Sequence, residues 1–247
     1  MKNAGKGSRS SSRAHRPSRQ ILTDGAYETI KELVMDNQLE PGERINIEEL
    51  ARQLEISTTP VREALARLES DGLIRKRALT GYAVAPLLDL ASLGHLFEIR
   101  HLLEPHAAAK AAKLANDLEL ANLREMVELM RADDIGDAYG HYRAFAAHDT
   151  EFHALIARYS GNPVLEQTLA GLHFQWHLYR LRFEPEVGLD TIAEHANIAT
   201  AILQRDAAAA AEAMREHLRQ SEQRLLPVAQ GGAQGFKRDR GSGDTAR

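Results

Sequence analysis

The spacing of hydrophobic positions predicts three short helices in the first third of the chain. Apolar residues recur at steps of three and four over residues 24–37, as in a helix with one buried face. Two more helices are predicted over residues 47–54 and 58–70, the second with Ser57 as its N-cap. The apolar positions of the three helices are Ala26, Ile30, Leu33, Val34, Leu50, Ala51, Leu54, Ile56, Val61, Ala64, Leu65 and Leu68.

After Asp71-Gly72, which ends the third helix, the spacing of hydrophobic positions shortens to every second residue. Residues 73–77 and 82–85 alternate weakly and flank a turn that contains Gly81, so they predict a small β-hairpin. Two helices joined by a turn and followed by a hairpin outline a winged helix-turn-helix. In that fold the second helix of the pair fits the major groove of DNA.

Polar residues at the start of the third helix are candidates for DNA contact. Hydroxyls, backbone amides and an arginine between Ser57 and Arg62 can meet phosphates and base edges there. The alternative for Arg62 is an ion pair with Glu63 or Glu69 on a solvated face. Arg75, Lys76 and Arg77 beside the hairpin turn suit phosphate or minor-groove contact, with a solvated charge run as the alternative.

Beyond Pro86 every long segment over residues 88–226 has helical periodicity, which predicts about six helices in an all-α bundle. The expected fold is therefore mainly α, with a winged helix-turn-helix over residues 20–86 and a helical domain over residues 87–227. Residues 1–19 and 228–247 are predicted to be loose tails. The expected helix breaks lie near residues 116–117, 135–136, 161–163, 185–188 and 205–206.

Charge separates the two predicted domains. Residues 1–86 carry 14 Lys and Arg against 12 Asp and Glu, whereas the remainder carries 17 against 23, so DNA contact is expected only at the N-terminal end. The basic first tail is either inert or adds nonspecific DNA affinity. The chain has no cysteine and no apolar run long enough to span a membrane, so a soluble cytoplasmic protein is expected.

Histidines supply the candidate chemistry of the helical half, where ten of the 11 lie. Asp149 and His153 are four residues apart and share one helical face, and His195 and His217 also lie among apolar neighbours. Three imidazoles and a carboxylate suit a divalent ion such as Zn²⁺, Ni²⁺ or Mn²⁺. Spacing alone leaves two alternatives, an ion pair with unrelated histidines or a rival set that contains the pair His173 and His177.

The stretch LARQLEISTTPVREALARLESDGLI, followed by TGYAVAP, resembles the DNA-binding domain of the GntR family of bacterial transcription regulators, over about residues 26–86. The resemblance implies DNA contacts at Ser57, Thr58, Thr59, Arg62 and the backbone of Gly81. Further candidates for DNA contact are Arg67, Arg75 and Arg77. The chain departs from the family pattern in the turn and on both helices. Glu55 stands where glycine is frequent, and Thr58 and Glu48 stand where arginine occurs.

Four further segments, FEIRHLLEPHAAAKAA, HDTEFHALIARYSGNPVL, EHANIATAI and AMREHL, resemble the FCD ligand-binding domain of the FadR-type subfamily. The resemblance implies the metal ligands Asp149, His153, His195 and His217. It also suggests that Arg100 faces a cavity and holds a ligand carboxylate, whereas spacing alone favours a helix ion pair with Glu104. Further candidates for the ligand pocket are Asn197, His173, His177 and Tyr142.

The expected function is a homodimeric transcription regulator, not an enzyme, that binds a palindromic operator. A small carboxylic acid in the metal-containing domain would change the spacing of the two DNA-binding domains, with repression relieved by ligand as the family's common pattern. The alternative is a metal-dependent hydrolase or lyase that carries a DNA-binding module. Against it, the sequence has no evident nucleophile motif. A helical scaffold with unoccupied histidines is the third reading.

Overall fold

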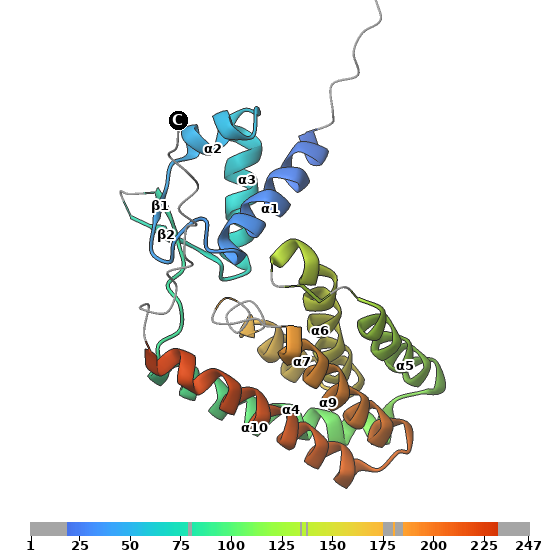
Figure 1. Ribbon diagram of the computed structural model, residues 1–247. Helices are drawn as coiled ribbons and strands as arrows, with labels where there is room; N and C mark the ends of the chain where they lie inside the picture. The colour runs from blue at the N-terminus through green and yellow to red at the C-terminus, as the bar shows by residue number, and fades with distance from the viewer. Residues whose placement is uncertain are drawn as a thin grey trace, which may run out of the picture.

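A computed structural model describes residues 19–231 except residues 79–80, 134, 137, 175–179 and 181–184. Figure 1 shows an N-terminal unit of helices and short strands beside a larger unit made of helices. Both predicted tails fall almost entirely outside the described residues.

The N-terminal unit is a winged helix-turn-helix, as predicted. Its sheet has the strand order β1-β3-β2 with both pairs antiparallel. The first helix begins at Arg19, five residues before the predicted start, and the short strand β1 was not predicted. The elements are α1 (Arg19–Met35), β1 (Arg44–Ile45), α2 (Ile47–Gln53), α3 (Thr58–Ser70), β2 (Ile74–Arg77) and β3 (Gly81–Val84).

Local interactions explain where the helices of this unit begin and turn. The Asn46 side chain caps α2 by accepting a hydrogen bond from the amide of Glu49 (3.1 Å). Glu55, in the turn between α2 and α3, has a positive φ of 55°, the left-handed backbone expected at this departure from glycine. Ser57 is the N-cap of α3 as predicted, but its hydroxyl makes no capping hydrogen bond.

The C-terminal unit is a bundle of six helices within the described residues, which confirms the predicted all-α architecture. Two predicted helix boundaries in this unit were wrong. The expected break at residues 185–188 is the first turn of α9, where Pro185 is tolerated because the first amides of a helix need no partner within it. The last helix extends to Gly231, into the predicted tail. The helices are α4 (Leu90–Leu114), α5 (Asp117–Ala132), α6 (Tyr139–Tyr159), α7 (Pro163–Ala170), α9 (Pro185–Leu203) and α10 (Ala207–Gly231).

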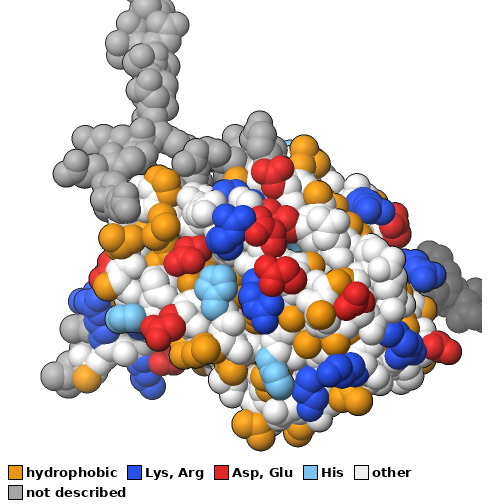
Figure 2. All heavy atoms as spheres, turned by 90° about the horizontal axis from the view of Figure 1, so that it is seen from below, with side chains coloured by type: hydrophobic (Ala, Val, Ile, Leu, Met, Phe, Trp, Pro, Cys, Tyr) orange, Lys and Arg blue, Asp and Glu red, His pale blue; other side chains and the backbone are white. Residues whose placement is uncertain are grey.

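Helices α4 and α10 run along one another, and they form the side of the molecule that Figure 2 faces. On that face basic side chains are interspersed with acidic side chains and histidines, so they form no continuous basic surface. Among the described helices, none is both long and apolar enough to cross a membrane.

Helix α6 joins the two units. Its first turns carry Tyr139, Tyr142 and Ala146 into the hydrophobic core of the winged helix-turn-helix, and its later turns carry Phe145 and Phe152 into the core of the bundle. The N-cap residue of α6 is Ala138, which offers no side-chain acceptor. A carboxylate oxygen of Asp36, directly after α1, instead accepts from the Tyr139 amide (2.8 Å).

A buried arginine makes a second contact between the units. Arg180 of the C-terminal unit donates from Nη2 to the carbonyl oxygen of Ala85, at the end of the hairpin (2.8 Å). Burial lowers the pKa of Arg180 to about 10. Sequence reasoning did not single this residue out, because its partner is a backbone oxygen 95 positions away.

Candidate metal centre and nucleic-acid interface

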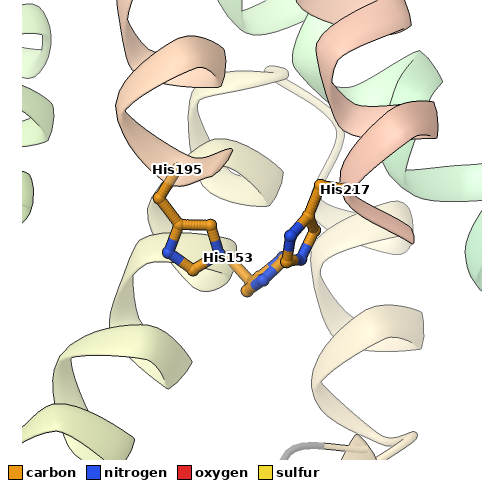
Figure 3. A group of neighbouring side chains, drawn as sticks. All are labelled: His153, His195 and His217. Atoms are coloured by element: carbon orange, nitrogen blue, oxygen red, sulfur yellow. The ribbon is translucent and has the colours of Figure 1, made fainter. Parts of the chain in front are cut away.

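Three imidazoles from three helices meet inside the bundle. His153 lies on α6, His195 on α9 and His217 on α10, and one ring nitrogen of each lies within 4.8 Å of the others (Figure 3). Asp149, one turn before His153, places Oδ1 at 3.5 Å from Nε2 of His195 and 4.0 Å from Nε2 of His153. All four side chains are buried. The structure therefore brings His153, His195 and His217 together and places Asp149 beside two of them.

Two glutamates orient two of the histidines. Nδ1 of His153 lies 2.6 Å from a carboxylate oxygen of Glu104, and Nδ1 of His217 lies 2.7 Å from one of Glu194. An imidazole that donates from Nδ1 to a carboxylate keeps the lone pair of Nε2 for a metal ion. The contacts therefore fix the tautomer that a metal site requires.

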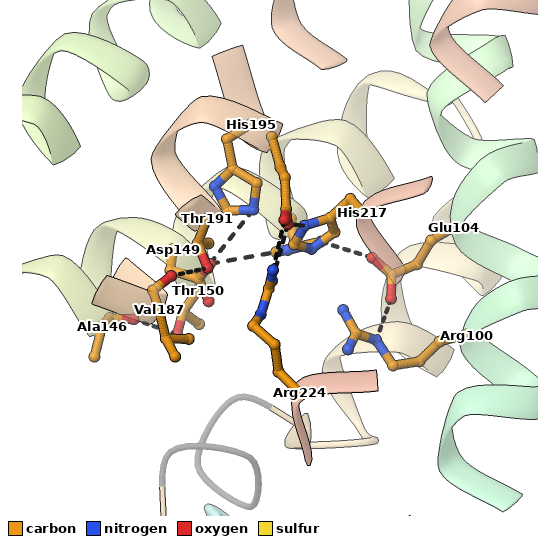
Figure 4. Close-up of polar contacts among 12 residues, drawn as sticks. Arg100, Glu104, Ala146, Asp149, Thr150, Val187, Thr191, His195, His217 and Arg224 are labelled. Carbon is orange, nitrogen blue, oxygen red and sulfur yellow. Dashed lines mark hydrogen bonds and ion pairs between the residues drawn. The ribbon is translucent and has the colours of Figure 1, made fainter. Parts of the chain in front are cut away.

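An arginine supports each glutamate. Arg100 donates from Nε to Glu104 (2.5 Å), and Arg224 donates from both terminal nitrogens to Glu194 (2.7 and 3.0 Å; Figure 4). Burial would raise the pKa of both carboxyl groups, but the charges and hydrogen bonds of their Arg and His partners lower it instead. Both glutamates are therefore carboxylates at neutral pH, so each can accept the histidine N–H.

Sequence reasoning missed Glu194 and Arg224. Helical spacing offered one indication, since Arg224 follows His217 by seven residues and so lies on the same face of α10 two turns later. Nothing in the sequence indicated that Glu194, directly before His195, would contact a residue on another helix.

His195 carries the strongest physical indication of a missing partner. The side chain is fully buried and stacks on Phe152, with ring centroids 4.2 Å apart. Among the described residues neither ring nitrogen has a hydrogen-bond partner. Burial, and then the nearby His217 and His153, lower its pKa well below the ordinary value, so the ring is neutral. A neutral imidazole that gains no hydrogen bond is costly to bury, unless it coordinates an ion.

Arg100 has features of both roles considered from the sequence, an ion pair with Glu104 and a cation that faces the interior of the bundle. It pairs with Glu104, but the pair is buried inside the bundle, with Arg100 only 1% exposed. Its guanidinium carbon lies 3.7 Å from the ring centroid of Phe174, and Nη1 has no hydrogen-bond partner among the described residues. One donor of a fixed cation is thus available near the histidines.

The remaining pocket candidates that the structure describes do not join this cluster. Asn197 is exposed on α9, because two residues of helix turn it away from buried His195. His173 is partly exposed in a turn with a positive φ of 47°. Tyr142 was wrongly expected to line the pocket, since it packs against the winged helix-turn-helix. His177 lies outside the described residues, so the rival pair with His173 is not defined.

The residues expected at DNA lie on the outside of the N-terminal unit. Ser57, Thr59 and Arg62 are exposed at the start of α3, and Thr58 is half-buried. Arg62 lies 3.8 Å from Glu48, at side-chain exposures of 57% and 74%, rather than beside Glu63 or Glu69. Such an exposed pair contributes little to stability and leaves Arg62 accessible.

The other basic candidates fall into two groups. Arg67 pairs with Asp24 of α1 (2.6 Å) and lies over the ring of Tyr27, so it links two helices of the unit. Arg75 and Arg77 are exposed on β2. Gly81 has a φ of 85°, a backbone that glycine adopts without strain and that suits the hairpin turn.

Comparison with known proteins gives two family matches. Residues 22–84 match the bacterial regulatory proteins of the gntR family, and residues 95–220 match the FCD domain. The Nta operon transcriptional regulator of Aminobacter aminovorans is 31% identical over 199 residues, which cover 77% of this chain and 88% of that protein. The Uxu operon transcriptional regulator of Escherichia coli is 29% identical over 240 residues, covering 88% and 90%.

Solved structures share the fold. E. coli McbR/YncC aligns with a TM-score of 0.63 at 24% identity, covering 83% of this chain and 97% of that one. A GntR transcriptional regulator from Rhodococcus sp. RHA1 aligns with a TM-score of 0.64 at 17% identity over the same shares.

Proposed function

The chain belongs to the gntR family of bacterial regulatory proteins and carries an FCD domain, and from this membership we propose a DNA-binding transcription regulator controlled by a small carboxylic acid. The relatives are named as operon regulators, and none of the comparisons favours a metal-dependent hydrolase or lyase. The enzymatic alternative is therefore set aside.

The observation that carries the sensing half of the proposal is the buried cluster of His153, His195 and His217 beside Asp149. Its donor set suits Zn²⁺, Ni²⁺ or Mn²⁺, because neutral imidazoles and a carboxylate are ligands of borderline divalent ions. The ring nitrogens of His195, which have no hydrogen-bond partner among the described residues, and the carboxylates behind His153 and His217 support the same assignment.

The effector is proposed to be a small carboxylic acid. A divalent ion held by the four side chains would supply an attachment point for a ligand carboxylate at any position that the protein leaves open. Arg100 contributes the second attachment, because its Nη1 has no partner among the described residues and its position is fixed by Glu104 and Phe174. Asn197 is not proposed as a contact, since its side chain is exposed.

Binding in the bundle is proposed to alter DNA affinity through a homodimer. Dimeric helix-turn-helix proteins contact half-sites about 34–36 Å apart, so a ligand that favours one separation of the two DNA-binding domains changes operator affinity. Ser57, Thr58, Thr59, Arg62 and the backbone at Gly81 are the proposed DNA contacts on α3 and the hairpin. Arg67 is a weaker candidate because it is engaged with α1.

The proposal is tested by loading untagged protein with Zn²⁺, Ni²⁺ or Mn²⁺ and screening small carboxylic acids by thermal shift. A ligand at 100 times its Kd stabilises the folded protein by about 2.7 kcal/mol. An acid that raises the melting temperature should also change binding to an operator selected from random duplexes, and the acid should be recovered unchanged. Turnover of the acid would restore the enzymatic alternative.

Two histidine variants separate the proposed site from the rival set. His195→Ala should lower metal content and abolish the response to the acid, while the affinity for mixed-sequence DNA stays unchanged. His173→Ala should retain both properties. The reverse result would move the metal site to His173 and its neighbours.

Arg100→Lys tests the carboxylate contact. Lysine keeps the positive charge beside Glu104 but lacks the planar fork, so metal content should stay unchanged while affinity for the acid falls about 10- to 100-fold. Equal affinity for the acid in titrations of the two metal-loaded proteins would remove Arg100 from the effector site.

A further inference from the structure

The sheet of the winged helix-turn-helix has two different faces. Residues paired across antiparallel strands project to the same face, and successive residues project to opposite faces. One face carries Ile45, Ile74 and Val84, which are buried in the hydrophobic core of the unit. The pairing therefore directs the alternate residues of the three strands outward.

That outward face presents three arginines. Arg44 of β1 and Arg75 of β2 both pair with Ala83 of β3, and Arg77 pairs with Gly81. All three arginines are exposed, whereas of their partners on the central strand Gly81 is exposed and Ala83 is buried. Arg44 thus lies in the same row as Arg75, although the two are 31 positions apart in the sequence. We refer to Arg44, Arg75 and Arg77 as the arginine face.

Ion pairing distinguishes these three arginines from the others in the unit. Over the described part of residues 19–86, each remaining arginine pairs with an acidic side chain, and none of the three does. The paired residues are Arg19 with Glu63, Arg52 with Glu49, Arg62 with Glu48 and Arg67 with Asp24. Glu43, the acid next to Arg44 in the sequence, accepts a hydrogen bond from the amide of Glu40 (2.7 Å) and is not paired with Arg44 among the described residues. The arginine face therefore keeps its charge and donors available for an external anion.

We propose that the arginine face binds the phosphate backbone of duplex DNA and that β1 contributes Arg44 as a phosphate contact. The proposal rests on the proposed function and adds a strand that the sequence did not mark as part of the interface. Arg44 and Arg75 are separated by two strand spacings, about 10 Å. Because each strand of duplex DNA carries one charge per about 3.4 Å of the helix axis, a face of this width can meet more than one phosphate.

The salt dependence of DNA binding tests this assignment without knowledge of the operator. The affinity of the full chain for a mixed-sequence duplex is measured over a series of KCl concentrations. Each phosphate contact contributes about 0.9 to the slope of log affinity against log salt, so Arg44→Ala should reduce the slope by about 1 and weaken binding. Arg44→Lys should restore the slope, because a phosphate accepts either cation.

The matched control is Arg131→Ala, which removes an exposed arginine of α5 that pairs with Glu128. It should leave the slope unchanged, and Arg44→Ala should unfold at the wild-type temperature. A slope for Arg44→Ala equal to that of Arg131→Ala would overturn the proposal while leaving the regulator function intact. A selective loss for the operator would also overturn it, since that indicates base readout. Failure of the wild-type chain to bind any duplex would instead refute the proposed function.

Discussion

Glu104 is a single buried carboxylate that positions two side chains of the proposed site. One oxygen accepts from Arg100 at 2.5 Å, and the other accepts from Nδ1 of His153 at 2.6 Å. The interaction with Arg100 keeps Glu104 ionised despite its burial, and the ionised carboxylate sets the His153 tautomer. The proposed metal ligand and the proposed effector contact therefore depend on the same residue.

Glu104→Gln should lower metal affinity about 10- to 100-fold, because a neutral amide holds the His153 tautomer less firmly. Competition with a chromogenic chelator measures the change. The control is Glu216→Gln, an exposed position on the same helix as His217. Equal metal affinity for Glu104→Gln and wild type would show that His153 needs no carboxylate behind it.

Arg62→Ala should lower operator affinity by about 1–3 kcal/mol while the free energy of unfolding changes by less than about 0.5 kcal/mol. The small stability effect follows from the exposed and long contact with Glu48. Binding to the selected operator at physiological salt measures the first quantity. Arg52→Ala, which removes an exposed arginine of α2 that pairs with Glu49, is the matched control. Wild-type operator affinity for Arg62→Ala would remove this residue from the interface.

The residues of the site differ in how far the sequence revealed them. Asp149 and His153 share a helix and a face, so spacing alone indicated that they meet. His195 and His217 were joined to them through family resemblance, because no local pattern reports which helices pack together. Arg224 and Glu194 were missed for that reason, since their contacts cross from α10 to α9.

At the scale of elements, α6 connects the two cores of the molecule. Its first turns pack against the winged helix-turn-helix, and Asp149 and His153 lie in the turns that follow. A helix is stiff along its axis, so a displacement at the metal ligands moves Tyr139 and Tyr142 as well. The winged helix-turn-helix and the proposed sensor thus share helix α6.

Asp36→Ala should lower the free energy of unfolding by about 1 kcal/mol, as expected for loss of a side chain that caps a helix. The reason is that the Tyr139 amide loses its acceptor and Ala138 offers no replacement. Urea unfolding measures the loss. Asp36→Asn retains an amide oxygen and should keep most of the stability. A loss of equal size in both variants would attribute the effect to charge rather than to capping.

Periodicity predicted the elements better than their ends. The apolar stripes of α1 and α3 and the helical bundle follow directly from hydrophobic spacing. Strand β1 escaped prediction because two residues are too few to display alternation, and its pairing with β3 is set by the tertiary fold. The early start of α1 lies in a polar stretch, where no apolar period marks a helix.

At the scale of the whole molecule, regulation requires a free-energy coupling between operator and effector. If the acid changes operator affinity by some factor, the operator must change affinity for the acid by the same factor. Allosteric proteins show such factors of about 5- to 150-fold. The contacts of α6 with α1, and of Arg180 with Ala85, are routes through which the two units can be coupled.

In the metal-loaded protein, saturation with operator should therefore change the affinity for the acid by some factor. Saturation with the acid should change the affinity for the operator by the same factor. Calorimetric titration of the acid, with and without the duplex, measures the first factor, and DNA-binding titrations measure the second. Unequal factors would indicate that a further equilibrium, such as subunit dissociation, takes part.

The Asp36 carboxylate that accepts from the first amide of α6 affects how domains of these proteins can be exchanged. A chimera that joins this C-terminal bundle to the DNA-binding domain of a relative keeps this hydrogen bond only if it supplies a side-chain oxygen at the position of Asp36. A partner with an apolar residue there would fold around an α6 whose leading amide lacks an acceptor. Compatibility between the halves of such hybrids therefore depends on this carboxylate as well as on the packing of Tyr139 and Tyr142, and both lie outside the histidine cluster.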